Sequence, residues 1–251
     1  MALLSDAVML LYWDIEGDNP DHDDWHTHEH MHERLSIPGF LRGTRWVTRS
    51  GPPSYLAIYE VSGVDVAMSA MYLARLNDPT PWTTSVMSRV RGMIRGFCTV
   101  AGSSGYGLGS VAFSMRFSPV EGRETEVRDR LARQVLPAMA SRRGLASVHL
   151  LEPVSRPPIT KEQLLRGGDA DMTWVLLMTA YDAKALTRAC AEHLDTVELE
   201  RYGISSRVEN GTYALHYIVT ATEVARTAPN PPLHPAAREQ TGVRRSNVER
   251  A

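Results

Sequence analysis

The sequence predicts an α+β fold made of two βαββαβ units in tandem, and three observations lead to that prediction. The same order of strands and helices occurs twice along the 251-residue chain. A glycine- and serine-rich stretch at residues 102–110 separates the two copies, as expected for a linker. With 43% apolar residues, the chain is long enough to bury two domain-sized cores. Repetition of one unit within a chain indicates an internal duplication.

The first unit, residues 1–104, shows four strand-like stretches and the helical regions that connect them. Its short runs of apolar and aromatic residues end at turn-forming clusters, and its first helix carries aspartates near the start, where they suit the positive end of the helix dipole. The sequence Pro38-Gly39 ends that helix. The predicted strands are residues 7–15, 40–48, 55–61 and 93–101, and the predicted helices are residues 21–36, 64–76 and 82–90.

The second unit, residues 109–220, repeats this order, with a polar excursion at residues 153–171 between its two middle strands. Its predicted strands are residues 111–117, 145–151, 172–181 and 212–220, and its predicted helices are residues 123–141 and 183–199. We expect each unit to form a four-stranded antiparallel, ferredoxin-like sheet with helices on one face. The bare faces of the two sheets must be buried, so we expect them to pack together.

The remaining residues, 221–251, form a tail rich in proline and arginine with little apolar periodicity. This composition is typical of a disordered arm, and an arm that wraps the body or a second subunit is the alternative.

Charge, hydropathy and cysteine content exclude several classes of partner. The net charge of −2 gives no basic field for nucleic acid or anionic lipid, and no apolar stretch approaches the length of a membrane span. Cys98 and Cys190 are the only cysteines, and two free thiols are expected rather than one disulfide. These features favour a cytoplasmic protein.

The most informative stretch is residues 25–40, in and after the first predicted helix. Five of the nine histidines fall within residues 21–33. On an ideal helical wheel, Trp25, His28 and His32 face the sheet, whereas His30 lies on the other side. His30 would then reach a pocket only if the helix unwinds near residues 30–32 or if the pocket lies against another element. The alternative is that most of these histidines belong to a solvated helix face.

The same stretch resembles a pattern of the dimeric α+β barrel proteins, among them the EthD-like proteins. In that pattern Trp-x-x-x-Glu-His-x-x-Glu-Arg-Leu leads into Pro-Gly-Phe and a strand that contains arginine, and residues 25–45 follow it. The similarity covers residues 5–100, with His32 standing where the pattern usually has proline. The resemblance implies a single-chain version of the dimeric barrel and makes His30 the candidate catalytic residue. In the second unit Val135 falls at the position of His30, so we expect one site per chain.

The predicted site combines a proton-transfer group with an aromatic pocket. A histidine with a near-neutral pKa can move a substrate proton, and a neighbouring glutamate can orient it. Arginines can hold a carboxylate or phenolate, although an ion pair within the protein is the alternative, and aromatic side chains can line an apolar pocket or simply pack in the core. The candidate catalytic residues are His30, Glu29 and His26, and the candidate ligand-binding residues are Tyr12, Trp25, Arg34, Arg45, Trp46, Tyr59, Tyr72 and Trp82.

These residues predict an enzyme of secondary or degradative metabolism that acts on an apolar or aromatic organic substrate. Lyase, isomerase, cyclase and decarboxylase chemistry all fit a histidine acid/base. The alternatives are a non-catalytic small-molecule binding protein and a metal- or haem-dependent oxidative enzyme. The string from His28 to His32 matches His-Glu-x-x-His, but a strand follows at once and no third ligand is apparent, so no metal or other cofactor is predicted. The expected partner is a small-molecule substrate, and a homodimer is a possible assembly that the sequence leaves open.

Overall fold

The structure is a computed structural model that describes residues 2–17, 19–48 and 51–227, and its strands form two similar sets. In the first repeat these are β1 (Ala7–Ile15), β2 (Phe40–Val47), β3 (Tyr55–Val61) and β4 (Val90–Gly105). In the second repeat they are β5 (Val111–Phe117), β6 (Leu145–Pro153), β8 (Trp174–Ala180) and β9 (Glu209–Thr220). The two-residue strand β7 (Ala170–Asp171) pairs in parallel with β4.

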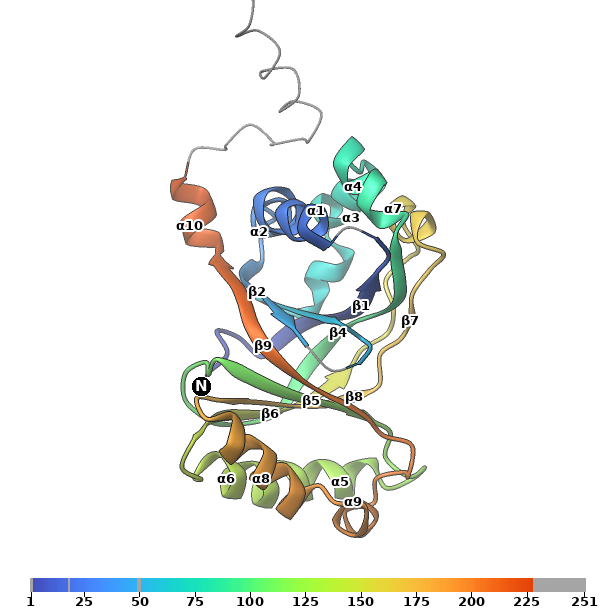
Figure 1. The fold of residues 1–251 in the computed structure, drawn as a ribbon. Coiled ribbons are helices and arrows are strands. Elements are labelled where there is room, and N and C mark those ends of the chain that lie inside the picture. The colour runs from blue at the N-terminus through green and yellow to red at the C-terminus, as the bar shows by residue number, and fades with distance from the viewer. Residues whose placement is uncertain (1, 18, 49–50, 228–251) are drawn as a thin grey trace, which may run out of the picture.

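Helices connect these strands and lie on the outside of the sheets (Figure 1). In the first repeat they are α1 (Asn19–Trp25), the π-helical η1 (His26–His30), α2 (Met31–Leu35), the 3-10 helix η2 (Val64–Met68), α3 (Ala70–Asn77) and α4 (Pro81–Met87). In the second they are α5 (Glu124–Arg130), the π-helical η3 (Leu131–Val135), α6 (Leu136–Ala140), α7 (Lys161–Leu165), α8 (Ala183–His193) and α9 (Thr196–Tyr202), followed by α10 (Ala221–Arg226).

The eight long strands form one closed, antiparallel barrel. Within each repeat the fourth strand pairs with the first, the first with the third and the third with the second, which is the ferredoxin-like order. The two repeats meet at two equivalent junctions, in each of which the second strand of one repeat pairs with the fourth strand of the other: β2 with β9 and β6 with β4. The two sheets therefore face each other as expected, and their edges also pair, so that no edge of the eight-stranded barrel stays open.

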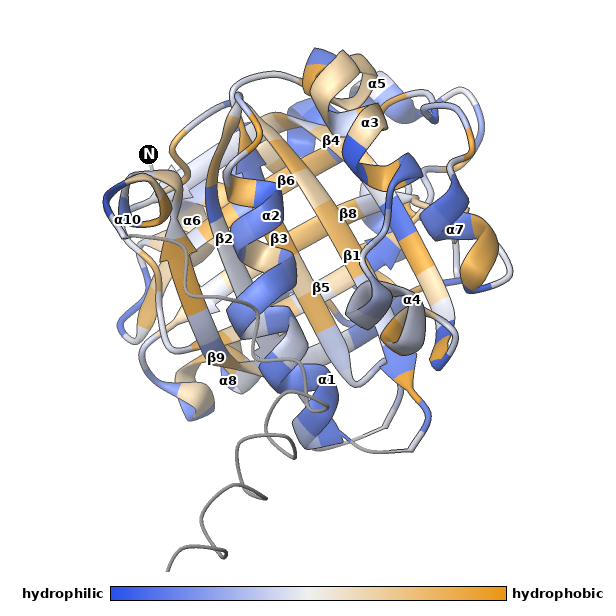
Figure 2. Ribbon diagram, turned by 90° about the horizontal axis from the view of Figure 1, so that it is seen from above, coloured by the Kyte–Doolittle hydropathy of each residue, from blue (hydrophilic) through white to orange (hydrophobic). Residues whose placement is uncertain are grey.

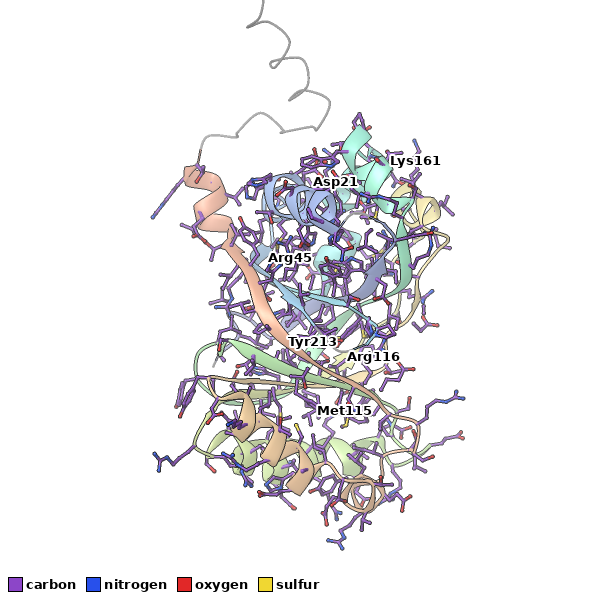
Figure 3. The ribbon with its side chains drawn as sticks, viewed as in Figure 1. Asp21, Arg45, Met115, Arg116, Lys161 and Tyr213 are labelled. Carbon is purple, nitrogen blue, oxygen red and sulfur yellow. The ribbon has the colours of Figure 1, made fainter. Side chains whose placement is uncertain are left out.

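Three apolar cores fill this architecture. One lies inside the barrel, and the others lie between each half of the barrel and its own helices. Figure 3 places Tyr213 and Arg116 between the two sheets and Arg45 under the first-repeat helices. Figure 2 shows the hydrophilic α1–α2 helix lying across strands that are largely hydrophobic. This helix thus places polar side chains over an apolar sheet face.

Several predicted boundaries differ from the structure. The predicted linker is wrong in its first part, because β4 continues to Gly105 and Gly105 pairs with Ser147 of β6. Helical regions predicted as single segments after β3 and after β8 are each divided in two. The tail begins with α10, and residues 228–251 lie outside the described residues. The domain limits 1–104 and 109–220 stay a proposal, since one barrel is shared by both repeats.

Both cysteines are free thiols, as predicted: Cys98 is buried inside the barrel and Cys190 is half-buried on α8. Within residues 2–17, 19–48 and 51–227, none of the helices combines the length and apolar character needed to cross a bilayer.

Candidate functional site

The first-repeat helix contains a π-helical turn that decides where its histidines point. The backbone N–H of Met31 donates to the carbonyl of His26, five residues earlier, so the turn holds one more residue than an α-helical turn. This extra residue rotates the helix face, and the ideal wheel is therefore wrong here. His22, His26 and His30 are buried against the sheet, whereas His28 is exposed. The alternative of a solvated histidine face is wrong for these three residues.

The three buried histidines form a row with aromatic residues on either side. The ring centroids of His22 and His26 are 5.9 Å apart and those of His26 and His30 are 5.6 Å apart, both in stacked orientation. Trp25 packs on His30 at 4.3 Å, and Trp13 of β1 lies 5.5 Å from His26. The row therefore lies between the helix and the outer face of the barrel, within an aromatic layer.

Hydrogen bonds fix the protonation of His22. The indole N–H of Trp13 donates to Nε2 of His22 at 3.1 Å, so this nitrogen is an acceptor and Nδ1 carries the hydrogen. That Nδ1–H donates to the Asp23 carboxylate, also at 3.1 Å. Burial lowers the pKa of His22 and outweighs the opposing effect of Asp23, so this side chain is a neutral, structural histidine.

His26 lies between Arg45 and Tyr59. Arg45 approaches Nδ1 of His26 at 3.4 Å, and the Tyr59 hydroxyl lies 3.4 Å from Nε2. Burial and the Arg45 guanidinium hold the pKa of His26 well below its ordinary value. Both ring nitrogens of His26 thus have partners within the protein.

His30 differs from both because its Nδ1 atom has no partner. Among the described residues, only two buried side-chain nitrogen or oxygen atoms lack a hydrogen bond, namely Nδ1 of His30 and Nη1 of Arg34. Burial holds the pKa of His30 well below its ordinary value, and the Arg34 guanidinium lowers it further. Buried polar groups are almost always satisfied, so two unsatisfied groups one helical turn apart require a partner that the protein does not supply, either a water molecule or a ligand.

His30 and Arg34 line the same cavity, which has a volume of about 20 Å³. This volume is room for about one water molecule. Besides these two residues, the cavity is lined by Leu11, Trp13, Trp25, His26, Met87, Val90, Met93, Arg95, Glu162 and Arg166. The walls are thus aromatic and aliphatic around a small group of charged residues.

Part of this charged group comes from the second repeat, which sequence reasoning missed. Glu162 of α7 forms an ion pair with Arg34, and Arg166 lies 3.4 Å from the other oxygen of Glu162. Asp169 accepts from Arg166 at 2.7 and 2.9 Å and pairs with Arg95 at 3.1 Å. The only signal in the sequence was the polar excursion at residues 153–171, which carries these residues across to the first repeat.

The other predicted site residues lie at varied distances from the cavity. Arg45 is buried beneath the helix, where it donates to the backbone of Asp23, to Thr27 and to His216, so its guanidinium is occupied by the protein. Tyr59 and Tyr72 belong to the first-repeat core and do not line the cavity, but the Tyr59 hydroxyl lies beside His26 and the Tyr72 hydroxyl accepts from Arg95 at 3.1 Å. Trp82 donates to Asp21 at 3.1 Å. Their roles in binding stay predictions.

Tyr12 and Trp46 are placed away from the site, so their assignment to the same pocket is corrected. Both lie inside the barrel, where the Tyr12 hydroxyl bonds Ser114 at 2.6 Å and the Trp46 indole donates to Thr44 at 2.8 Å. Successive strand residues face opposite sides of a sheet. Trp13 and Arg45, their sequence neighbours, therefore take the helix side.

Glu29 does not contact His30 through a hydrogen bond in the structure. Its Oε1 atom accepts from Thr80 at 2.5 Å and from Thr83 at 3.2 Å, and Thr83 in turn accepts from the Trp25 indole at 3.1 Å. Glu29 thus holds α4 against the helix and fixes the Trp25 wall of the cavity.

His28 and His32 line a separate, open groove of about 970 Å³ between α2 and α10. Its other walls are mostly apolar and include Leu35, Phe40 and Val219. Glu29 of the His-Glu-x-x-His string lines the same groove, but its carboxylate is bonded to two threonines. Within the part of the chain that the structure describes, no group of three or more His, Cys, Asp or Glu side chains is placed to hold a metal ion.

Comparisons with known proteins identify the fold. No protein-family model matches the chain, and no curated protein matches its sequence. An anthrone oxidase-like protein superposes with a TM-score of 0.61 at 11% identity, covering 91% of this chain and 99% of that chain. Candidate monooxygenases from Lactobacillus acidophilus and Fusobacterium nucleatum superpose with TM-scores of 0.55 and 0.53 at 9% and 8% identity. They cover 86% and 87% of this chain and 97% and 96% of their own. The chain therefore has the dimeric α+β barrel fold, with both halves of the barrel in one polypeptide, which confirms the fold predicted from its sequence.

Proposed function

We propose that the chain is a small-molecule enzyme in which His30 removes a proton from carbon in an apolar, aromatic substrate. The observation that carries this proposal is the pair of unsatisfied atoms, His30 Nδ1 and Arg34 Nη1, in one buried cavity. A base and an oxyanion partner side by side are what the formation of an enolate or phenolate requires.

In the proposed step the substrate C–H bond breaks and an N–H bond forms on His30. The electron pair of the C–H bond forms a C=C bond to the carbonyl carbon, and the π pair of the C=O bond moves onto the oxygen, which becomes an oxyanion. Arg34 Nη1 donates to this oxyanion, and the new imidazolium lies beside it. Burial keeps His30 neutral, so its lone pair is available without prior loss of a proton. The anion compensates the positive charge that the base acquires.

The cavity walls suit a flat, apolar ring. Trp13, Trp25, Met87 and Met93 surround the polar pair, and their side chains give apolar contact without competing for the base. Because the cavity admits only about one water in this arrangement, a wall must move before a ring can bind.

Proton abstraction is the step that several reactions share. Reprotonation at another atom gives an isomerisation, expulsion of a group gives a lyase, and reaction of the anion with oxygen gives an oxidation. The fold neighbours described as anthrone oxidase-like and as candidate monooxygenases favour a test with anthrone, whose CH₂ group is acidified by two rings and a conjugated carbonyl.

The test is deuterium exchange at the CH₂ group of anthrone in D₂O without oxygen, followed by NMR, with 2-tetralone as a second carbon acid. We expect the wild-type protein to accelerate exchange and H30Q to lose about 100-fold or more of that acceleration. H28Q is the matched control, because His28 lies on the same helix but is exposed. Exchange by H30Q at the wild-type rate, or no acceleration by the wild type with either probe, would overturn the proposal.

A further inference from the structure

We infer that the site binds a substrate that carries a carboxylate or another anionic group. In the closed site, α7 covers the cavity and its Glu162 bonds Arg34 at the position that the substrate anion would occupy. The inference rests on the proposed function only in using the same cavity, and it concerns binding rather than the base.

The guanidinium groups around the cavity outnumber the carboxylates that bond them. Three guanidinium groups, those of Arg34, Arg95 and Arg166, meet two carboxylates, those of Glu162 and Asp169. All five side chains are at least nine-tenths buried. The neighbouring arginines lower the pKa of both carboxylic acids, so both are ionised, and the histidines of the cavity are neutral. Arg34 and Arg166 therefore share Glu162, and one guanidinium edge of the group has no carboxylate opposite it, since Glu33 pairs with Arg75 and Glu29 is bonded to two threonines.

Arg34 is the group with unused capacity. Its Nη2 atom pairs with Glu162, whereas its Nη1 atom is buried without a partner. Arg166 is saturated by Asp169 and Glu162, and Arg95 pairs with Asp169 and Tyr72. A guanidinium presents two parallel N–H groups that fit both oxygens of one carboxylate. A substrate carboxylate on Arg34 would take one N–H of each Nη atom, whereas Glu162 takes Nη2 alone, and the second N–H of Nη1 would stay available to the oxyanion of the proposed step.

The structure also indicates which wall moves. The segment that carries α7 leaves the second repeat after β6 and lies against α3 and α4 of the first repeat, near the right edge of the barrel in Figure 1. Charged contacts hold it there, and of its large apolar side chains Leu165 packs against the first-repeat core, whereas Ile159 and Leu164 are 73% and 68% exposed. Ion pairs can be exchanged for similar ion pairs, whereas an apolar interface would have to be opened to water. Displacement of α7 would open the cavity and release Arg34 together.

The test compares an anionic probe with its neutral counterpart, 2-naphthoate with 2-naphthalenemethanol, by calorimetry. The two protein variants are E162Q, which keeps Arg34 and removes the competing carboxylate, and R34M/E162Q, which removes both charges of the pair. Met139 occupies the position of Arg34 in the second repeat, so methionine fits this place in the fold.

We expect 2-naphthoate to bind E162Q at least five-fold more tightly than wild type and at least ten-fold more tightly than R34M/E162Q. The neutral alcohol should bind the two variants equally. In thermal melts 2-naphthoate should raise the melting temperature of E162Q more than that of wild type. Equal effects on the acid and the alcohol, or no binding of 2-naphthoate to E162Q, would overturn the inference.

H30Q separates this result from the proposed function. If the anion site exists but His30 is not the base, H30Q keeps both naphthoate binding and proton exchange. If His30 is the base but the site does not recognise anions, proton exchange is lost in H30Q, and 2-naphthoate binds E162Q and R34M/E162Q equally well.

Discussion

The first helix of each repeat follows the same backbone path, but the side chains that it buries are polar in the first repeat and apolar in the second. Both helices contain a π-helical turn, at His26–His30 in the first repeat and at Leu131–Val135 in the second, and both end before a glycine of positive φ, Gly39 and Gly144. In this register His22, His26, His30 and Arg34 correspond to Val127, Leu131, Val135 and Met139. All eight side chains are buried.

This comparison separates what the fold requires from what the site requires. Since the second repeat forms the same turn with apolar residues, the π-helical turn does not depend on histidine. Apolar residues also bury at these positions without the desolvation cost that imidazole and guanidinium groups carry. The first repeat therefore keeps a less stable set of side chains at positions where the second shows that a stable set fits, and a function at His30 and Arg34 accounts for it.

The largest expected effect is a loss of stability at mildly acidic pH that originates in the first repeat. His22, His26 and His30 have lower pKa values in the folded chain than the ~6.5 of an unfolded histidine, so the folded state binds fewer protons. Their contribution is present above pH ~6.5 and is lost as the pH falls, by up to about 1.4 kcal/mol per pH unit for each histidine and about 4 for the three together.

The variant H22V/H26L/H30V gives the first repeat the side chains of the second and is the matched comparison. Urea unfolding between pH 7.5 and 5 should show a steep loss of the free energy of unfolding for wild type and a shallower one for the variant. His149, whose pKa burial lowers to about 4, is unchanged in both and cancels in the difference. Parallel pH profiles for the two proteins would show that the histidine row is not buried as described.

The next largest effect is expected at the ion pair between the repeats. R34M places the second-repeat residue at this position and leaves Glu162 buried with Arg166 as its remaining partner. Removal of one member of a buried pair costs about 3 kcal/mol, whereas replacement of both members is often neutral. In urea unfolding, R34M should therefore lose about 3 kcal/mol and R34M/E162Q should regain more than half of it. If R34M is as stable as wild type, α7 is not held by this pair.

The repeat architecture and the helix that carries His30 could be predicted from the sequence because both leave local signals. Alternating strands and a motif of fixed spacing can be read within short windows. The π-helical turn could not, because one additional residue in a turn changes no composition, and it reversed the faces assigned to His28 and His30. The cap could not either, since Glu162 meets Arg34 from 128 residues away. Strand alternation requires Arg45 and Trp46 to face opposite sides of the sheet, but it does not say which of them faces the helices.

A smaller loss of stability, equal in the two repeats, is expected at the glycine that follows the first helix of each repeat. Gly39 and Gly144 have φ of +96° and +94°, a region that side chains with a Cβ atom rarely adopt. An added Cβ would lie 2.5 Å from Val66 and 2.3 Å from Ala185, respectively. G39A and G144A should each lower the free energy of unfolding by about 2 kcal/mol in thermal or urea melts. A large difference between the two variants would mean that the two turns are not equivalent.

The smallest effect is expected at Glu29, where it decides between two roles. Glu29 was a candidate to orient His30, but its carboxylate accepts from Thr80 and Thr83 instead. The second repeat has the exposed Gln134 at this position. In E29Q the amide oxygen can still accept both bonds, so exchange of a charge-assisted for a neutral hydrogen bond should cost about 1 kcal/mol of stability. Deuterium exchange of anthrone should change less than three-fold, against the ~100-fold loss expected for H30Q. A loss in E29Q that approaches the loss in H30Q would instead assign Glu29 to the proton-transfer step, and the bonds to the two threonines would then have to break when substrate binds.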